Sequence, residues 1–237
     1  MKPFLKETFD FFRDLVIIVL IVLFIRSFLF MPFQINGQSM YSSYYDKQFI
    51  IVDRFSYLDI DIIWKQSAPD RWDVVVFRPE IDRDKEFFIK RVIGLPGETI
   101  QIEDGKVYLL DTESWEYIEI VEGYLDEKNN WRTFVRGSEW KKTYEIPDDG
   151  YFVMGDNRNA STDGRTCFST CSTRTSYITQ ENIIGKVGLD LGYFDLIDSI
   201  YPFKLGSLSF SHPELSGIDT TAQWLSSPAE HEYEFIR

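Results

Sequence analysis

Ser39 and Lys90 are the two side chains whose types and surroundings indicate nucleophilic chemistry. Ser39 ends a Gly37-Gln38-Ser39 turn, which can expose a hydroxyl, although serines beside glycines are more often ordinary turn residues. Lys90 lies in an apolar run, where strand alternation turns either Lys90 or Arg91 toward the apolar face. Burial can lower the pKa of a lysine by about 3–5 units, which would make its neutral amine a base for a serine. The alternative is an edge-strand lysine that reaches solvent.

The positions of histidine and cysteine narrow the chemistry further. The only histidines are His212 and His231, both near the C-terminus, so a Ser-His-Asp hydrolase or a histidine-bound catalytic metal is disfavoured. Cys167 and Cys171 are spaced C-x3-C, which does not match a zinc ribbon. Two readings of this pair stay open: a short disulfide in an oxidising compartment, or two packed thiols. No metal or organic cofactor is expected.

A third polar element runs from Met154 to Arg165, directly after a predicted strand. Its charged residues could form charge-assisted pairs that stiffen a site around Ser161. The rival interpretation is a metal site formed by the carboxylates of Asp156 and Asp163.

These residues must be positioned by strands. Short β-branched or aromatic runs bounded by Gly, Pro or Asp predict strands, and alternation around Asp104-Gly105 predicts a hairpin. The runs are Ile50–Val52, Asp73–Phe77, Phe87–Ile93, Thr99–Leu109 and Tyr151–Met154. We therefore expect a mainly β fold, with an antiparallel β catalytic domain formed by residues 34–110 and 145–200. Residues 111–144 are expected to be a smaller β-rich insertion, and residues 201–237 a loosely ordered tail.

The apolar run Leu15–Phe33 is expected to be a single transmembrane helix. Its nineteen residues would span roughly 28 Å as a helix, about the thickness of a hydrocarbon core. The rivals are a buried soluble helix and a cleaved secretory signal, but no small-x-small cleavage site follows. Basic residues before the run place residues 1–14 in the cytoplasm and the rest outside. The net charge of −13 argues against a nucleic-acid partner.

Taken together, these elements resemble the bacterial type I signal peptidase (leader peptidase) family over about residues 10–190. Ser39-Met40, the Lys-Arg-Val-Ile-Gly-Leu-Pro-Gly-Glu run from Lys90, and the Gly-Asp-Asn-Arg-x-x-Ser-x-Asp-x-Arg run from Gly155 stand in the family's order. The weaker Asp73–Phe77 segment also fits. The resemblance implies a membrane-bound serine endopeptidase of the cell membrane that removes signal peptides from exported preproteins, cutting after small residues. Its partners would be signal peptides and the lipid bilayer.

The resemblance also implies roles for individual residues. Ser39 would attack the scissile carbonyl, Lys90 would take its proton, Ser161 would orient the lysine amine, and the Ser39 backbone N–H would hold the oxyanion. Structural support is expected from Asp156, Arg158, Asp163 and Arg165, with an ion pair between the last two. Pockets for the substrate are expected to be lined by Phe33, Ile35, Tyr44 and Ile89.

Several segments depart from the family pattern. Tyr41–Tyr44, Lys47-Gln48 and Cys167–Tyr177 replace typical sequences, and Gly37 stands where one branch has a serine that completes the oxyanion hole. None of these changes involves Ser39, Lys90 or Ser161. Two other classes stay open: a single-pass binding or assembly module that lacks activity, and a Ser-Lys autoprotease of the repressor type.

Overall fold

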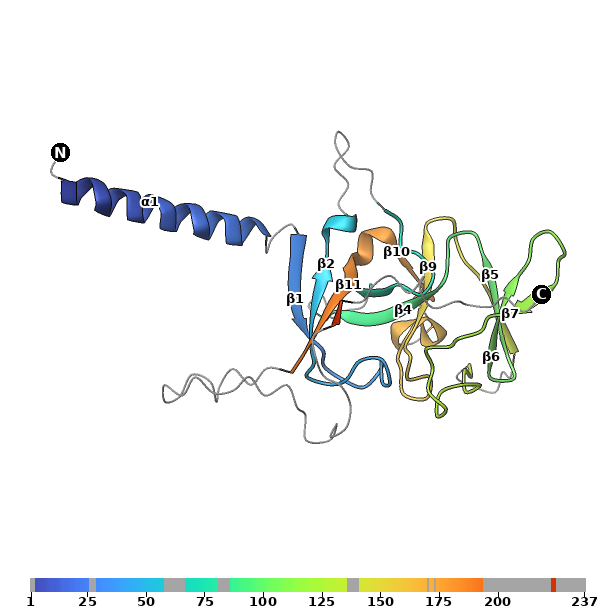
Figure 1. The fold of residues 1–237 in the computed structure, drawn as a ribbon. Helices are drawn as coiled ribbons and strands as arrows, with labels where there is room; N and C mark the ends of the chain where they lie inside the picture. Colours follow the sequence, from blue (N-terminus) through green and yellow to red (C-terminus); the bar gives the residue numbers. More distant parts are fainter. Residues whose placement is uncertain are drawn as a thin grey trace.

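The protein folds mainly as antiparallel β-structure, as predicted, behind one long N-terminal helix (Figure 1). The structure is a computed structural model that describes residues 3–25, 29–57, 67–80, 86–135, 141–169, 171–172, 174–193 and 223–224. The strands expected around Ile50–Val52, Asp73–Phe77, Phe87–Ile93 and Tyr151–Met154 are all present.

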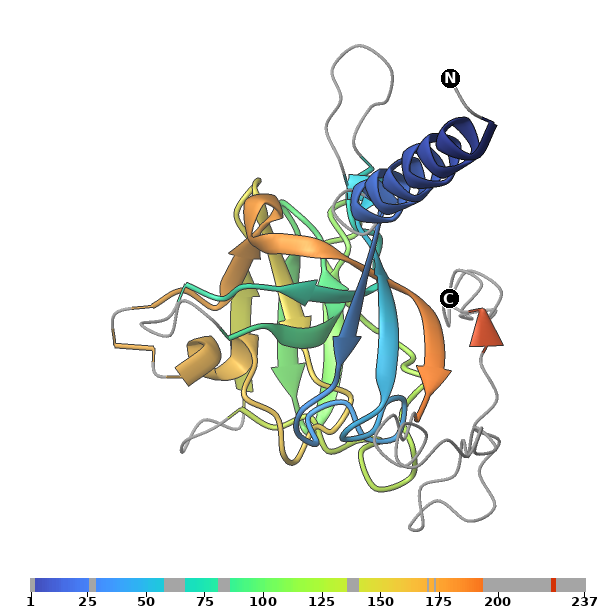
Figure 2. The ribbon, with the colours of Figure 1, turned by 90° about the vertical axis from the view of Figure 1, so that its left-hand side faces the viewer.

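The larger sheet has the strand order β1-β2-β11-β3-β4-β9-β10, and β12 pairs with β11. Its strands are β1 (Phe30–Gln34), β2 (Phe49–Asp53), β3 (Val74–Phe77), β4 (Phe88–Gly94), β9 (Gly150–Met154), β10 (Tyr177–Thr179), β11 (Ile183–Gly192) and β12 (Gln223–Trp224). In Figure 2, β1, β2 and the orange β11 lie alongside one another. Because β4 lies between β3 and β9, both edges of the strand that carries Lys90 are paired.

Glycine allows the close approach of two strands in this sheet. At Gly185 in β11, a Cβ would collide with the backbone carbonyl of Asp53 at the end of β2. This glycine-rich strand was not predicted, because its glycines interrupt the β-branched pattern on which the prediction depended.

A smaller sheet has the order β7-β6-β5-β8, formed by β5 (Thr99–Glu103), β6 (Lys106–Leu110), β7 (Tyr117–Glu119) and β8 (Lys141–Glu145). The predicted hairpin is confirmed, with positive φ at Asp104 (50°) and Gly105 (80°). β5 and β6, expected within the catalytic unit that ends at residue 110, pair with β8 and β7 in this smaller sheet. Ile100 and Ile102, both buried, anchor the core that these strands share with Tyr144.

The N-terminal helix α1 spans Pro3–Phe24 and extends away from the strands (Figure 1). The expectation of a single helix from Leu15 to Phe33 is wrong at both ends, since Phe30–Gln34 forms strand β1 paired with β2. Pro32 is compatible with this strand, because β1 lies at the edge of the sheet, where proline is tolerated. Among the helices within the described residues, none is both long enough and apolar enough to cross a bilayer.

The expected C-terminal tail lies largely outside the described residues. Beyond Tyr193, only Gln223–Trp224 is described, and it pairs with Leu189 and Asp190 of β11. The expectation of loose order for the remainder of residues 201–237 therefore stays a prediction.

Candidate active site

Ser39 and Lys90 meet through a direct hydrogen bond. The Nζ of Lys90 lies 2.7 Å from the Oγ of Ser39. Ser39 stands in the connection between β1 and β2, whereas Lys90 is in the middle of β4. Met40, only 1% exposed, anchors the turn by packing in a core cluster with Ile35 and Val76. The sheet therefore brings together two residues that are 51 positions apart.

The lysine amine occupies a buried, largely apolar site. Lys90 is 3% exposed, pairs in register with Val75 of β3, and has the ring of Phe88 centred 5.3 Å from its Nζ. Burial lowers the pKa of Lys90 to about 8, although the charges of Asp163 and Asp156 oppose this effect. At neutral pH the site therefore holds far more neutral amine than a solvent-exposed lysine would.

Ser161 is buried next to the dyad, but its predicted contact with the lysine is absent. Its Oγ makes no hydrogen bond to Lys90 among the described residues, but it lies close enough to Asp163 to help lower the pKa of that carboxylate. The Lys90 amine instead donates its second hydrogen bond to the backbone carbonyl of Ile89, at 2.7 Å. In this conformation, then, the lysine is held by its own strand rather than by Ser161.

Gly155 explains how the loop after β9 reaches the nucleophile. A Cβ at this position would collide with the Oγ of Ser161 and with the backbone carbonyl of Ser39. Only glycine permits so close an approach without movement of the backbone. Close packing against Ser39 and Ser161 therefore explains why the first residue of the Gly-Asp-Asn motif is glycine.

The ion pair predicted between Asp163 and Arg165 is present. The guanidinium donates from Nε to Oδ1 at 2.9 Å and from the terminal NH2 group to Oδ2 at 2.8 Å. The backbone N–H of Gly155 also donates to Asp163, at 3.0 Å. Burial alone would raise the pKa of Asp163, but Arg165 and these donors lower it overall. The pair fixes the loop that carries Ser161 to the end of β9.

Asp156 is bound by a residue that the sequence did not identify as a partner. Arg91 donates to its carboxylate from Nε at 3.0 Å and from NH2 at 2.7 Å, and Ser43 Oγ donates at 2.6 Å. The guanidinium also lies 4.1 Å from the centre of the Tyr124 ring. Lys90 and Arg91 thus point to opposite faces of β4, and only the arginine has a hydrogen-bonded carboxylate. The carboxylates of Asp156 and Asp163 are each paired with an arginine. This pairing argues against the alternative in which they bind a metal ion.

Arg158 links the loop after β9 (residues 155–165, the catalytic loop) to the smaller sheet region (residues 99–135 and 141–145). Its guanidinium bonds bidentately to Glu122 and also donates to Tyr124 Oη, at 2.9 Å, and to Thr133. Its Nε donates to the carbonyl of Gly155 at 3.1 Å. A side chain from the predicted support set therefore joins the loop after β9 to the segment between β7 and β8.

A cleft of about 610 Å³ opens beside the dyad. Both Ser39 and Lys90 line it, together with three of the four residues predicted to bind substrate: Phe33, Ile35 and Ile89. The fourth prediction, Tyr44, is not supported by the geometry, since Tyr44 is 5% exposed and packs in the core with Met40. Its aromatic ring fills the space beneath the nucleophile turn instead of reaching the cleft.

The nucleophile turn has two further supports that sequence reasoning missed. Asp46 accepts a hydrogen bond from the backbone N–H of Gly37 at 2.6 Å, and Gly37 itself has a φ of +104°. Asn157 contacts the backbone at Gln38 and Ser39. The Ser39 backbone N–H, predicted to be the oxyanion donor, has no hydrogen-bond partner among the described residues. It is therefore available to a ligand in the cleft.

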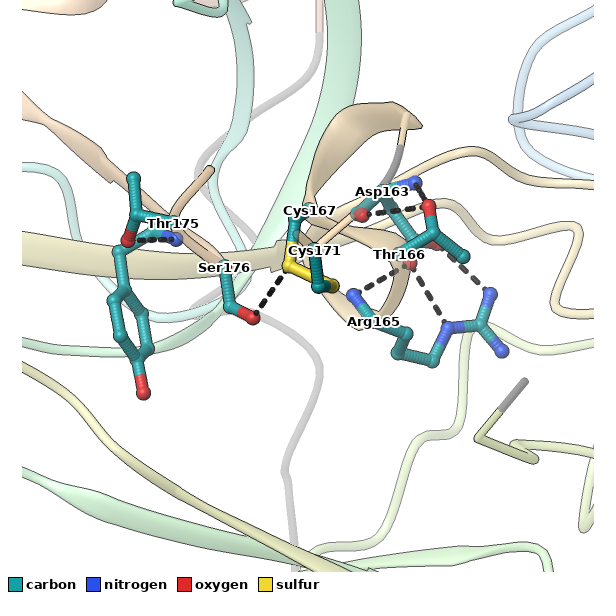
Figure 3. The surroundings of a disulfide bond; sticks show 8 residues. Asp163, Arg165, Thr166, Cys167, Cys171, Thr175 and Ser176 are labelled. Carbon is teal, nitrogen blue, oxygen red and sulfur yellow. Dashed lines mark hydrogen bonds and ion pairs between the residues drawn. A yellow bond between two sulfur atoms is a disulfide. The ribbon is translucent and has the colours of Figure 1, made fainter. Parts of the chain in front are cut away.

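The open question about the cysteines resolves in favour of the disulfide. Cys167 and Cys171 are bonded, with their Cα atoms 5.0 Å apart. Figure 3 shows the bond beside Asp163 and Arg165, with Ser176 Oγ 3.3 Å from the sulfur of Cys167. Cys167 belongs to η3 (Gly164–Ser169). The disulfide therefore forms a short covalent loop directly after the catalytic loop.

Comparison with known proteins identifies one family. The family model described as "Signal peptidase, peptidase S26" matches residues 8–191. A signal peptidase I of Pseudomonas fluorescens is 33% identical over 196 residues, which cover 71% of this chain and 67% of that protein. Signal peptidase I S of Bacillus subtilis is 30% identical over 164 residues, covering 68% and 79% respectively. A crystal structure of a signal peptidase I from Enterococcus faecalis is 28% identical, covers 51% of this chain and 97% of that one, and superposes with a TM-score of 0.37.

Proposed function

The chain belongs to the signal peptidase family, peptidase S26, and from this premise we propose that Ser39 and Lys90 form its catalytic dyad. It is a serine endopeptidase that removes signal peptides. The single observation that carries the assignment of residues is the 2.7 Å contact between Lys90 Nζ and Ser39 Oγ, formed by a buried lysine. A serine requires a base, and the lysine is the titratable group bonded to it.

The proposed reaction proceeds in two halves. Neutral Lys90 accepts the Ser39 proton as Oγ bonds to the scissile carbonyl carbon, and the resulting ammonium gives that proton to the departing amine when the peptide bond breaks. Lys90 is then neutral again and takes a proton from the water that attacks the ester on Ser39. As the bond between Oγ and the acyl carbon breaks, the ammonium returns this proton to Ser39 Oγ, which releases the carboxylic acid product and regenerates the dyad. In each half the negative oxygen of the tetrahedral intermediate would accept a hydrogen bond from the Ser39 backbone N–H.

Ser161 keeps a proposed role as an orienting residue for the lysine amine. Its hydroxyl is buried beside Asp163 and makes no hydrogen bond to Lys90 within the described part of the chain. A hydroxyl can accept a hydrogen bond from the amine once Ser39 Oγ is bonded to substrate. Asp156, Arg158, Asp163 and Arg165 contribute in this proposal by holding the loop, through the ion pairs described above.

The cleft suggests how substrate specificity arises. Phe33, Ile35 and Ile89 surround the space beside Ser39 with bulky apolar side chains. Walls of this kind would admit small residues before the cleaved bond, while an extended peptide pairs with strand edges. We therefore propose cleavage after small residues of exported preproteins.

Two observations support a membrane-bound location for the enzyme. The apolar residues of α1 and its end, from Leu15 to Ile25, are each 40–60% exposed, so the helix presents a large apolar surface. The Cys167–Cys171 disulfide is typical of an oxidising compartment. We propose that the apolar surface of α1 attaches the protein to the cell membrane, and that the sheets lie outside the cytoplasm.

Variants of the dyad test this proposal. With a peptide that carries an Ala-x-Ala end, we expect Ser39→Ala and Lys90→Arg each to lower kcat by roughly 10⁴-fold or more. Residues that act as one catalytic unit depend on each other, so the loss of either removes most of the activity. Arginine keeps the charge but cannot become a neutral base. The matched controls are Ser114→Ala and Lys106→Arg, both in the smaller sheet region, and they should cleave normally. Persistent cleavage by Ser39→Ala, measured by mass spectrometry of the products, would refute the assignment.

A further inference from the structure

Asn157 bonds to two successive backbone carbonyls at the nucleophile. Its side-chain Nδ2 donates to the carbonyl oxygen of Gln38 at 2.9 Å. Its own backbone N–H donates to the carbonyl oxygen of Ser39 at 3.0 Å. The loop after β9 therefore grips two successive peptide units of the segment that carries the nucleophile.

The side-chain contact sets the direction of the proposed oxyanion donor. The Gln38 carbonyl and the Ser39 N–H belong to the same peptide unit, which is planar and trans, so the two groups point in opposite directions. A donor that holds the Gln38 oxygen on the loop side therefore directs the Ser39 N–H to the other side. That N–H has no partner among the described residues, as expected of a donor kept for a ligand.

The turn itself supplies only a weaker restraint. The backbone N–H of Tyr41 also donates to the Gln38 oxygen, but at 3.3 Å and from within the same turn. The next residue toward the N-terminus, Gly37, has a φ of +104° and no heavy atom within 4 Å of where its Cβ would be. A short contact from a separate element is therefore the main restraint on this peptide unit.

We propose that Asn157 is a positioning residue that fixes the oxyanion-binding orientation of the Ser39 backbone N–H through its hydrogen bond to the Gln38 carbonyl. The inference rests on the proposed function, because it needs Ser39 as the nucleophile. Asn157 makes no hydrogen bond to Lys90 among the described residues and acts through the backbone of the nucleophile. Its loss should weaken binding of the transition state while leaving the lysine unchanged.

The test uses Asn157→Leu, which is similar in shape, uncharged and unable to donate. Asn157→Ala serves as the second variant should the first fail to fold. The matched control is Asn159→Ala, because the Nδ2 of Asn159 donates to the carbonyl of Lys128 instead, at 3.1 Å. All are measured in the full chain with the Ala-x-Ala peptide for kcat, KM and the pH dependence of kcat/KM.

We expect both Asn157 variants to lower kcat about 10- to 100-fold, less than full removal of an oxyanion donor, with KM within about two-fold of the parent and the pH inflection unchanged. Asn159→Ala should match the parent enzyme. Normal kcat in a folded Asn157 variant would overturn the inference, as would a change confined to KM or a moved pH inflection. The outcome is separable from the dyad itself: an inactive Ser39→Ala beside a fully active Asn157→Leu rejects only the role of Asn157.

Discussion

Lys90 and Arg91 are adjacent basic residues in one strand, yet they have opposite electrostatic surroundings. Arg91 has a carboxylate bonded through two of its nitrogens, so burial leaves it charged. Lys90 bonds only to a hydroxyl and a carbonyl, so burial lowers its pKa to about 8. At pH 7 about one such lysine in ten is neutral, against roughly one in 2,500 for an ordinary lysine. Because successive side chains of β4 face opposite sides of the sheet, Arg91 serves as a structural cation while Lys90 can serve as a base.

The Arg91–Asp156 pair should be important for stability. Asp156→Asn would leave a buried guanidinium without its counter-charge, and we expect a loss of about 3–5 kcal/mol in the free energy of unfolding. Urea denaturation followed by tryptophan fluorescence measures this loss. The control is Glu119→Gln, which breaks the partly exposed pair with Lys106 and should change the unfolding midpoint little. Equal stability of the two variants would show that the buried pair contributes no more than a surface one.

The dyad residues could be predicted from the sequence, whereas most of their partners could not. Ser39 and Lys90 stand in recognisable motifs, and Asp163 and Arg165 pair at short range within one loop. Arg91 and Asp156 are 65 positions apart, and Asn157 and Gln38 are 119 apart. Such contacts depend on strand order, which local patterns do not specify. Tyr44 shows the reverse problem, because an aromatic residue near a site can face the core as readily as the cleft.

At the scale of elements, local patterns succeeded where the periodicity was strong. The Asp104-Gly105 hairpin and the β-branched strands formed as expected. The prediction failed between Leu15 and Phe33, where a continuous apolar run contains both a helix end and strand β1. An apolar run has no periodicity to separate helix from strand, so only Pro32 marked the change. Pairing with β2 decides the conformation there, and that pairing is a tertiary effect.

The arrangement of elements also shows how the site is held together. Ser39, Lys90 and the loop from Gly155 come from three separate connections or strands, and each is bonded to another. Arg158 adds a link to Glu122 in the smaller sheet region. A site assembled from several fixed elements holds reacting groups in place without cost at the moment of reaction.

At the scale of the whole molecule, the exposed apolar surface of α1 separates this protein from an ordinary globular enzyme. Val19 is 48% exposed and Leu23 is 52% exposed, on a helix that extends away from the sheets (Figure 1). Water-exposed surface of this kind requires a covering, and the proposed lipid bilayer would supply it.

We expect the full chain to float with phospholipid vesicles in a density gradient. The double variant Val19→Asp with Leu23→Asp should float much less, because each aspartate at membrane depth costs about 3 kcal/mol. Its cleavage of the Ala-x-Ala peptide in detergent should be unchanged. The control is Val121→Asp, an exposed valine in the smaller sheet region, which should float like the parent. Equal flotation of the double variant would contradict the proposed anchor.

The pH dependence of kcat/KM tests the central claim most directly, since it reports the protonation of the base in the free enzyme. The neutral amine of Lys90 is the active form, so activity should rise with pH through an inflection near pH 8 and level off above it. The Lys90→Arg and Ser39→Ala variants should be inactive at every pH. Activity that is flat from pH 6 to 10, or that rises only near the ordinary lysine pKa of about 10.4, would contradict a buried lysine base.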